Sequence, residues 1–366
     1  NFTEFFGENY SMIDKINIFN NCEIVIGAIG GTITNTIFCN NNVKIITIVS
    51  PDFLNKNYRM KFLFNKNVKL FITPSGRLHQ YIFLVYQLLS ITFLHPNRLF
   101  YLIKYFFCIK KHEKIGIIDW WGKILPIVNN LPDIFHIQWA KSLPKLYFLK
   151  DKFDVRIILS LRGAHINYSP LSDLKLKNEY LNYFPKVDQF HAVSKAIATE
   201  SLNYGAIKEK IHVIYSSVNL SDIKKIKNSY HLKKTIQILS VGRFHWKKGY
   251  QYGLFTIRKL LDQGFNVRYT ILSSNAPSEE ILFLIKDLGL IEYLSIISPD
   301  SQSEVYNRMS MADCLLLPSV EEGIANVVLE SMAIGLPVIS SNCGGMVEVI
   351  KDSKNGFLFQ ARNVEQ

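Results

Sequence analysis

The sequence predicts an α/β protein with two domains. Residues 236–249 read as a buried strand that runs into a glycine turn, and residues 317–348 give a glycine-rich loop, a helix and a further strand. The third observation is length, because 366 residues are enough for two domains that each bury a core of their own.

Composition limits the function classes. A net charge of +12 suits an anionic acceptor, an anionic membrane surface or a nucleic acid. The lysines are scattered and no nucleic-acid module is evident, so a nucleic-acid partner is not expected. The 5 cysteines lack the spacing of a metal site or a disulfide framework, which predicts a reducing cytoplasm. No Asp-x-Asp motif occurs, so neither a metal nor a cofactor is expected.

The first elements along the chain are two strands at residues 23–26 and 43–49, joined by the loop GAIGGTITN. Two apolar stretches follow at residues 81–94 and 99–109, and both are shorter than the roughly 20 residues of a membrane-spanning helix. They pack on a core, which we favour, or they lie on a membrane surface with Lys104, Lys110 and Lys111 facing the headgroups.

Two strands of the middle region carry candidate site residues near their ends. The strand at residues 134–138 bears His136, and the strand at residues 155–161 ends at Arg162, with His165 three positions later. Ligands of open α/β sheets bind beyond the carboxyl ends of the strands, which favours a functional position for His136. A hydrogen-bonded structural histidine explains the same residue equally well.

The middle region closes with a helix, a strand and a lysine-rich segment. Ser194 is a typical N-cap for a helix that runs to about Asn203, and Gly205 ends it. A strand at residues 212–215 follows, and residues 220–234 are expected to link the domains.

The glycine turn after the strand at 236–241 is basic. Arg243, Lys247 and Lys248 precede Gly249. An arginine can clamp a diphosphate bidentately, and a lysine can neutralise it as a point charge. The turn therefore predicts a diphosphate site, although a solvated basic turn explains the same residues.

Two carboxylates bracket the start of the last predicted helix. Glu322 lies in the loop before it, and Glu330 lies about two turns along a helix that begins near Asn326 and ends at Gly335. The glycines allow a ligand to approach the backbone, and the helix N-terminus offers N–H groups to anions. Carboxylates can hold the hydroxyls of a ligand, and backbone amides can hold its phosphates. A nucleotide sugar has both groups, so it is the predicted ligand.

These two stretches, VGRFHWKKG and PSVEEGIANVVLESMAIGLPVISSNCGG, resemble the diphosphate loop and the double-glutamate motif of the retaining glycosyltransferases of family 4. The resemblance is close over residues 236–359 and looser back to about residue 130. It implies the GT-B fold, in which two Rossmann-like domains face a cleft. It also implies a role for each residue of the donor site. Arg243 and Lys248 would hold the diphosphate, Glu330 the ribose, and Glu322 the sugar, with help from the amides of Gly323 and Ile324.

The sequence departs from this family in the middle region and after one strand. The family has a histidine near the transferred sugar at the position where this chain has Arg162. His165 is therefore the candidate for the histidine's role, and Arg162 is a candidate for binding an anionic group. His136 is assigned to the acceptor side. The family commonly has a glycine-rich turn after the strand at 266–272, where this chain has SSNAPSEE.

The resemblance also divides the chain. Residues 1–72 form an N-terminal segment, 73–219 an acceptor-side domain, 220–234 a linker and 235–366 the donor domain. Residues 1–52 resemble the closing segment of family 61 glycosyltransferases, or alternatively begin the GT-B N-terminal domain; we favour the former. We expect the fold to be incomplete at both ends.

The implied function is transfer of a sugar from a nucleotide sugar to a glycan or lipid-linked acceptor, with retention, in the synthesis of a surface polysaccharide or glycolipid. We expect a cytoplasmic protein, with the inner face of the membrane as a further possibility through peripheral contact. The alternative is an inactive truncated remnant or a nucleotide-sugar-binding module.

Overall fold

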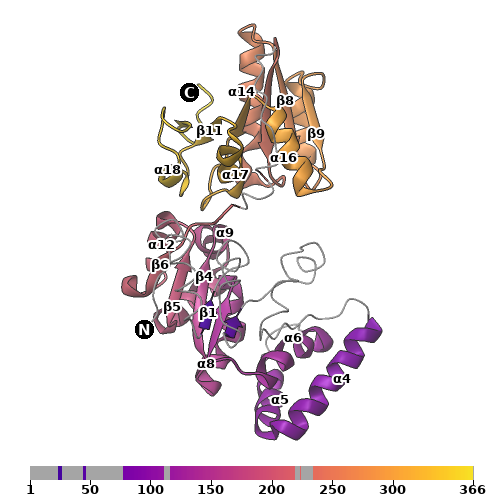
Figure 1. Ribbon diagram of the computed structural model, residues 1–366, viewed down its shortest axis with the longest axis vertical. Helices are drawn as coiled ribbons and strands as arrows, with labels where there is room; N and C mark the ends of the chain where they lie inside the picture. Colours follow the sequence, from indigo (N-terminus) through magenta and orange to yellow (C-terminus); the bar gives the residue numbers. More distant parts are fainter. Residues whose placement is uncertain are drawn as a thin grey trace, which may run out of the picture. The chain divides into compact units, whose positions relative to one another are not determined.

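The computed structural model describes residues 24–26, 44–46, 77–110, 116–218, 223 and 234–365. The chain divides into two compact units: a first unit, Asn1–Ser160 with Lys186–Gln189, and a second unit, Leu161–Pro185 with Phe190–Gln366. A four-stranded and a six-stranded parallel sheet form the two Rossmann-like domains (Figure 1), which confirms the predicted fold class. The units differ from these domains, because residues 190–192 and 211–213 of the four-stranded sheet belong to the second unit. The domain boundaries stay predictions, because the linker lies outside the described residues apart from Ile223 and Lys234.

The two N-terminal strands lie where the sequence predicts them. β1 (Ile24–Ile26) pairs in parallel with β2 (Lys44–Ile46), with Ile24 opposite Lys44. The glycine loop at 27–35 lies outside the described residues. Both interpretations of the N-terminal segment therefore stay predictions.

Three helices precede the four-stranded sheet: α4 (Arg77–Leu94), α5 (Pro96–Lys110) and α6 (Ile117–Asn129). The break between α4 and α5 comes at Pro96, because the residue before a proline is disfavoured in helical conformation. Asn129 of α6 donates from Nδ2 to Oε1 of Gln87 in α4 at 2.7 Å. Among the described helices, none is long and apolar enough to cross a membrane.

The four-stranded sheet has the order β3-β4-β5-β6. Its strands are β3 (Ile134–Ile137), β4 (Arg156–Leu161), β5 (Gln189–Ala192) and β6 (Ile211–Val213). The helices between them are α7 (Leu143–Leu146), α8 (Phe148–Phe153), α9 (Ala164–Asn167), α10 (Ser169–Ser172), α11 (Leu174–Tyr183) and α12 (Lys195–Leu202). Ser194 caps α12 as predicted, because its Oγ accepts from the Ile197 N–H at 3.1 Å.

The six-stranded sheet has the order β12-β11-β10-β7-β8-β9. Its strands are β7 (Ile236–Val241), β8 (Val267–Leu272), β9 (Leu294–Ile297), β10 (Cys314–Leu317), β11 (Val338–Ser341) and β12 (Phe357–Phe359). Its helices are α14 (Tyr250–Asp262), α15 (Glu279–Asp287), α16 (Gln302–Met311), α17 (Asn326–Ile334) and α18 (Met346–Val349).

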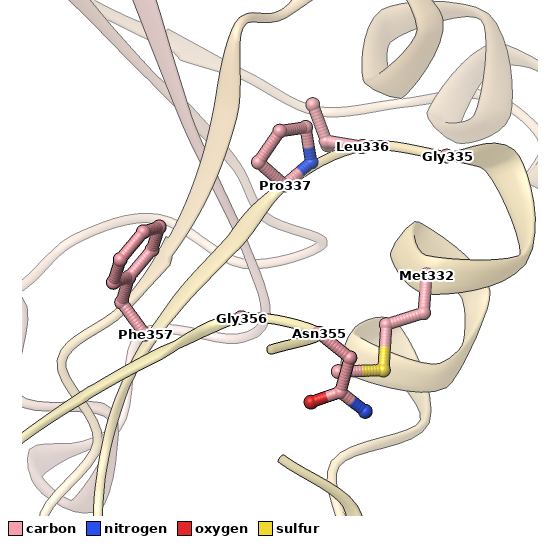
Figure 2. Close-up of a pocket in the computed structure, with 7 residues that line it drawn as sticks. All are labelled: Met332, Gly335, Leu336, Pro337, Asn355, Gly356 and Phe357. Atoms are coloured by element: carbon pink, nitrogen blue, oxygen red, sulfur yellow. The ribbon is translucent and has the colours of Figure 1, made fainter. Parts of the chain in front are cut away.

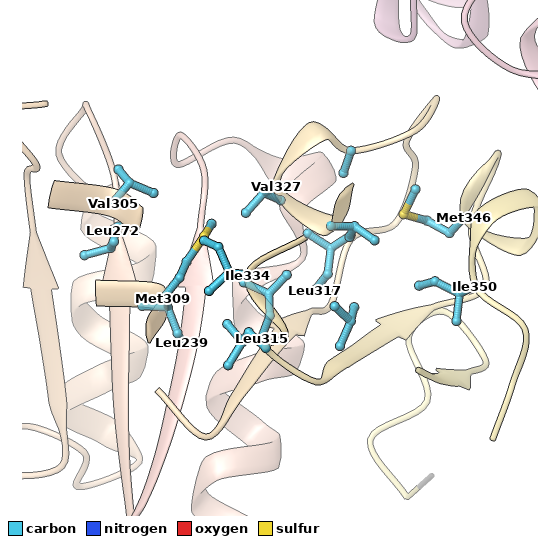
Figure 3. Packing of buried hydrophobic residues seen from close by; sticks show 14 of the residues in the cluster. Leu239, Leu272, Val305, Met309, Leu315, Leu317, Val327, Ile334, Met346 and Ile350 are labelled. Carbon is cyan, nitrogen blue, oxygen red and sulfur yellow. The ribbon is translucent and has the colours of Figure 1, made fainter. Parts of the chain in front are cut away.

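The central strands of this sheet have apolar side chains buried on both faces, because successive side chains point to opposite sides and helices cover each side. Ile238 of β7 packs in the cluster that includes α14 and α15. The next residue, Leu239, packs in the cluster that includes α16 and α17, where Leu315 and Leu317 of β10 meet Met309 and Ile334 (Figure 3). The sheet is therefore covered by helices on both faces.

Candidate functional site

Three loops meet at the carboxyl ends of the neighbouring strands β7, β10 and β11. They are the 242–249 loop, the 318–325 loop and the 342–345 loop. Backbone hydrogen bonds join them, from Val320 N to Lys247 O at 2.7 Å and from Gly345 N to Glu322 O at 3.3 Å. This is the edge of an open parallel sheet at which ligands bind.

Two glycines allow this close approach of backbones. Gly249 has φ +62°, and a Cβ there would lie 2.0 Å from Pro318 O. Gly344 has φ +49°, and a Cβ there would lie 1.8 Å from Glu322 O. Only glycine fits either position, both in backbone conformation and in space.

A buried ion pair lies at the centre of the site. The Glu322 side chain is 7% exposed, and Lys248 Nζ lies 2.6 Å from its Oε1 while Lys247 Nζ lies 3.4 Å from its Oε2. Ser319 Oγ also donates to Oε1 at 3.2 Å. Burial raises the pKa of Glu322, but the two lysines outweigh it, so the net pKa is lowered and the carboxylate stays charged.

Arg243 is exposed on the 242–249 loop. Both neighbours of Arg243 contact Tyr250: its OH donates to Gly242 O at 2.7 Å, and its ring packs on the Phe244 ring with centroids 4.8 Å apart. The loop thus presents a guanidinium to solvent from a fixed backbone, next to the lysines that pair with Glu322.

Glu330 lies closer to the helix start than predicted. It is the fifth residue of α17, which begins at Asn326, so it lies about one turn along the helix and not two. Tyr306 OH and Gln302 Nε2 of α16 donate to its Oε1, at 3.3 and 3.4 Å. Burial raises the pKa of Glu330, and the Tyr306 hydrogen bond offsets part of that effect.

The matches to known families decide the classification. The sequence matches the family described as Glycosyltransferase Family 4 over residues 79–222 and the family described as Glycosyl transferases group 1 over residues 222–366. The chain belongs to glycosyltransferase family 4.

Curated relatives are glycosyltransferases as well, and solved structures share the fold. The amylovoran biosynthesis glycosyltransferase AmsK of Erwinia amylovora is 29% identical over 62% of this chain and 57% of its own length. A Campylobacter jejuni N-acetylgalactosaminyltransferase, named for a diphospho-undecaprenol-linked acceptor, is 29% identical over 49% of this chain and 48% of its own length. Anabaena HepE, solved with UDP and glucose, has a TM-score of 0.61 at 16% identity and covers 93% of this chain and 86% of its own. The chain thus spans about half the length of the curated relatives it matches, and the likeness to HepE concerns the fold.

In this family 4 chain, the structure brings together most of the residues predicted for the donor. Glu322, Gly323, Ile324 and Lys248 lie in the joined loops, and Arg243 lies on the same 242–249 loop. Glu330 follows one turn into α17. The roles that the family resemblance implies for these residues stay predictions.

Arg162 and His165 also belong to the second unit. Arg162 is half-buried at the end of β4, and burial lowers its pKa. His165 is in the short helix α9, and Tyr180 OH donates to its backbone oxygen at 3.1 Å. The backbone between them lies near the donor loop, since a Cβ on Gly323 would be 3.9 Å from Gly163 N.

His136 belongs to the first unit and is buried in β3. Its Nε2 lies 2.9 Å from Ser160 Oγ, and its Nδ1 lies 3.2 Å from Gln138 Nε2. These contacts agree with the structural alternative for this histidine, and its acceptor-side role stays a prediction. Among the described residues, no group of three or more His, Cys, Asp or Glu side chains is placed to hold a metal ion.

A pocket of about 390 Å³ lies elsewhere on the second unit (Figure 2). It is lined by Met332, Gly335, Leu336, Pro337, Asn355, Gly356 and Phe357. Pro337 and Gly356 precede β11 and β12, so the pocket is at the amino ends of these strands. With a lining that contains no charged side chain, it does not suit a diphosphate.

Sequence reasoning missed three side chains that support the site. Ser319 bonds Glu322, Tyr306 bonds Glu330, and Asn275 bonds the backbone of the 242–249 loop at Phe244. Asn275 stands in SSNAPSEE, the segment where the family commonly has a glycine-rich turn, and that departure was the available signal.

Proposed function

We propose that this family 4 chain transfers a sugar from a nucleotide sugar to a glycan or lipid-linked acceptor, with retention of anomeric configuration. The observation that carries the proposal is the set of cations at the carboxyl end of β7, where Lys247 and Lys248 contact buried Glu322 and Arg243 faces solvent. Arg243 and Lys248 hold the diphosphate, because an arginine and a lysine together match its charge. Glu330 binds the ribose hydroxyls.

The reaction breaks the bond between the anomeric carbon and the diphosphate and forms one to the acceptor oxygen. Negative charge grows on the leaving phosphate, and Arg243 and Lys248 stabilise it from preorganised positions. Glu322, with the amides of Gly323 and Ile324, orients the sugar. The acceptor's proton passes to the leaving phosphate oxygen on the same face, so the step needs no protein nucleophile. We assign His165 a role near the transferred sugar. Arg162 binds an anionic group, and His136 lies on the acceptor side.

The acceptor class is a glycan or a lipid-linked sugar in the synthesis of a surface polysaccharide or glycolipid. Two relatives support it by their names, one a transferase of amylovoran biosynthesis and the other a transferase that acts on a diphospho-undecaprenol-linked sugar. An acceptor of the second kind is held at a lipid surface. We therefore place the protein in the cytoplasm, in peripheral contact with the inner face of the membrane.

The outer sides of α4 and α5 fit such a contact. Phe100 and Phe107 of α5 are 75% and 58% exposed, and exposed Lys104 lies between them at helical spacing. Neither helix contains an acidic residue in its sequence. An apolar face that carries Lys104 and no carboxylate complements an anionic lipid surface.

Replacing Phe100 and Phe107 together by serine is expected to reduce sedimentation with vesicles of phosphatidylglycerol and phosphatidylcholine, because the apolar area that enters the lipid is lost. Phe283→Ser is the control, since Phe283 is 69% exposed on α15. Equal sedimentation of the double variant and the wild type would exclude this surface as the contact. The same holds if the wild type binds vesicles of phosphatidylcholine alone as well as it binds vesicles that also contain phosphatidylglycerol.

The donor site is tested with a thermal-shift panel of UDP, GDP, ADP and their sugars. A ligand at 100 times its dissociation constant stabilises the folded state by about 2.7 kcal/mol. We expect a shift with the nucleotides of one base. Release of the nucleoside diphosphate on addition of a glycan or lipid-linked acceptor then separates an active transferase from a nucleotide-sugar-binding module. A protein that shifts with none of these compounds does not form the proposed site.

A further inference from the structure

A side-chain amide holds the backbone of the 242–249 loop at the residue that follows Arg243. The Phe244 N–H donates to Asn275 Oδ1 at 2.8 Å, and Asn275 Nδ2 donates to Phe244 O at 3.1 Å. One asparagine thus pairs with both backbone groups of Phe244, as the backbone of a neighbouring strand would.

Asn275 is itself anchored to the sheet. Ser273 directly follows β8, is 2% exposed, and donates its own N–H to Ile297 O at 2.9 Å. Its Oγ donates to Asn275 O at 2.9 Å and accepts from Asn275 N at 3.3 Å. The backbone of Asn275 is therefore hydrogen-bonded to a buried residue, Ser273, which the β8–β9 pairing holds in place.

This anchoring bears on donor binding because Arg243 and Phe244 are adjacent. A loop that is ordered only when the ligand arrives loses conformational freedom at that moment, which weakens binding. A loop ordered beforehand avoids that loss. The contacts of Asn275 fix Phe244, and the Tyr250 hydroxyl fixes Gly242, so the backbone is held on both sides of Arg243.

We propose that Asn275 is a positioning residue, which holds the 242–249 loop in the conformation that presents Arg243 to the donor diphosphate. It acts through the loop and does not itself contact the reacting atoms. The inference rests on the proposed donor role of Arg243.

The test compares Asn275→Ala with wild type for UDP, GDP and ADP, and for the nucleosides uridine, guanosine and adenosine, by calorimetry. Loss of the two hydrogen bonds should weaken diphosphate binding roughly fivefold or more. Nucleoside affinity should not change, because a nucleoside does not reach Arg243. Donor KM should rise while kcat changes little. Asn275→Asp keeps the acceptor, loses the donor and adds negative charge, so it should weaken binding further, and more so at low salt.

The matched control is Asn266→Ala. Asn266 precedes the opposite end of β8 and donates to Thr235 Oγ1 at 2.9 Å. Hydrogen exchange of the 242–249 loop in the free protein should be faster in Asn275→Ala and unchanged in Asn266→Ala. Equal diphosphate affinity of Asn275→Ala and wild type would overturn the role of Asn275 and leave the donor site standing. Failure of the wild type to bind any of the three nucleotides would overturn the donor site, and this role with it.

Discussion

Arg243→Ala is expected to abolish nucleotide diphosphate binding while the protein stays folded. A hydrogen bond to a charged group contributes about 1.5–3 kcal/mol, and a bidentate clamp loses two of them, which corresponds to a loss of 100-fold or more in affinity. Arg243 is exposed, so its removal should change the free energy of unfolding by less than about 0.5 kcal/mol. Calorimetric titration and denaturant unfolding measure the two quantities separately.

Arg268→Ala is the matched control for this prediction. Arg268 is exposed on β8, one strand from Arg243, and lies over the Tyr293 ring at 5.6 Å. Its removal also takes away one positive charge but should leave nucleotide binding unchanged. If both variants lose affinity equally, the effect is one of overall charge and the assignment of Arg243 is wrong.

Glu330→Gln is expected to change nucleotide binding and stability in opposite directions. A ribose diol donates two hydrogen bonds, and a carboxylate offers two acceptor oxygens where an amide offers one. Nucleotide affinity should fall by about 1.5–3 kcal/mol. Stability at neutral pH should rise, because the amide avoids the cost of burying a charge, while its oxygen can still accept from Tyr306.

The sign of the stability change follows from the raised pKa of Glu330. The folded protein binds the proton more tightly than the unfolded chain, so stability falls as pH rises from the ordinary value of 4.5 through the folded-state pKa. The gain from Glu330→Gln should therefore be present at pH 7 and absent below the ordinary value. Glu280→Gln, on an exposed position of α15, should show neither effect. Unchanged nucleotide affinity in Glu330→Gln would remove Glu330 from the donor site.

The local signals in the sequence located the helices and caps of the site well. Ser194 and Gly335 lie at the helix ends where they were predicted, because a side-chain cap and a left-handed glycine depend on neighbouring residues alone. The position of Glu330 was wrong by about one turn. The helix begins at Asn326 as predicted, and Glu330 follows four residues later, which is about one turn. The first half of the interval from Glu322 is loop, with Ala325 extended at ψ 117°.

The pairings within the site could not be predicted in the same way. Lys248 and Glu322 are 74 residues apart, and Phe244 and Asn275 are 31 apart. The register of the sheet brings each pair together, and no pattern within a short window encodes it. The family resemblance implied that Lys248 and Glu322 serve one ligand, but not that the two side chains bond each other.

The pairing of β7 with β10 has a consequence for how the protein is made. Ser240 of β7 donates to Leu316 O of β10, 76 residues later in the chain. Chain synthesis proceeds at about 5–20 residues per second, so β10 is made on the order of several seconds after β7. During that interval an apolar strand edge is open on the ribosome, and Gly249 has no partner loop to meet. Until β10 is made, this edge of β7 is open to pairing with another chain.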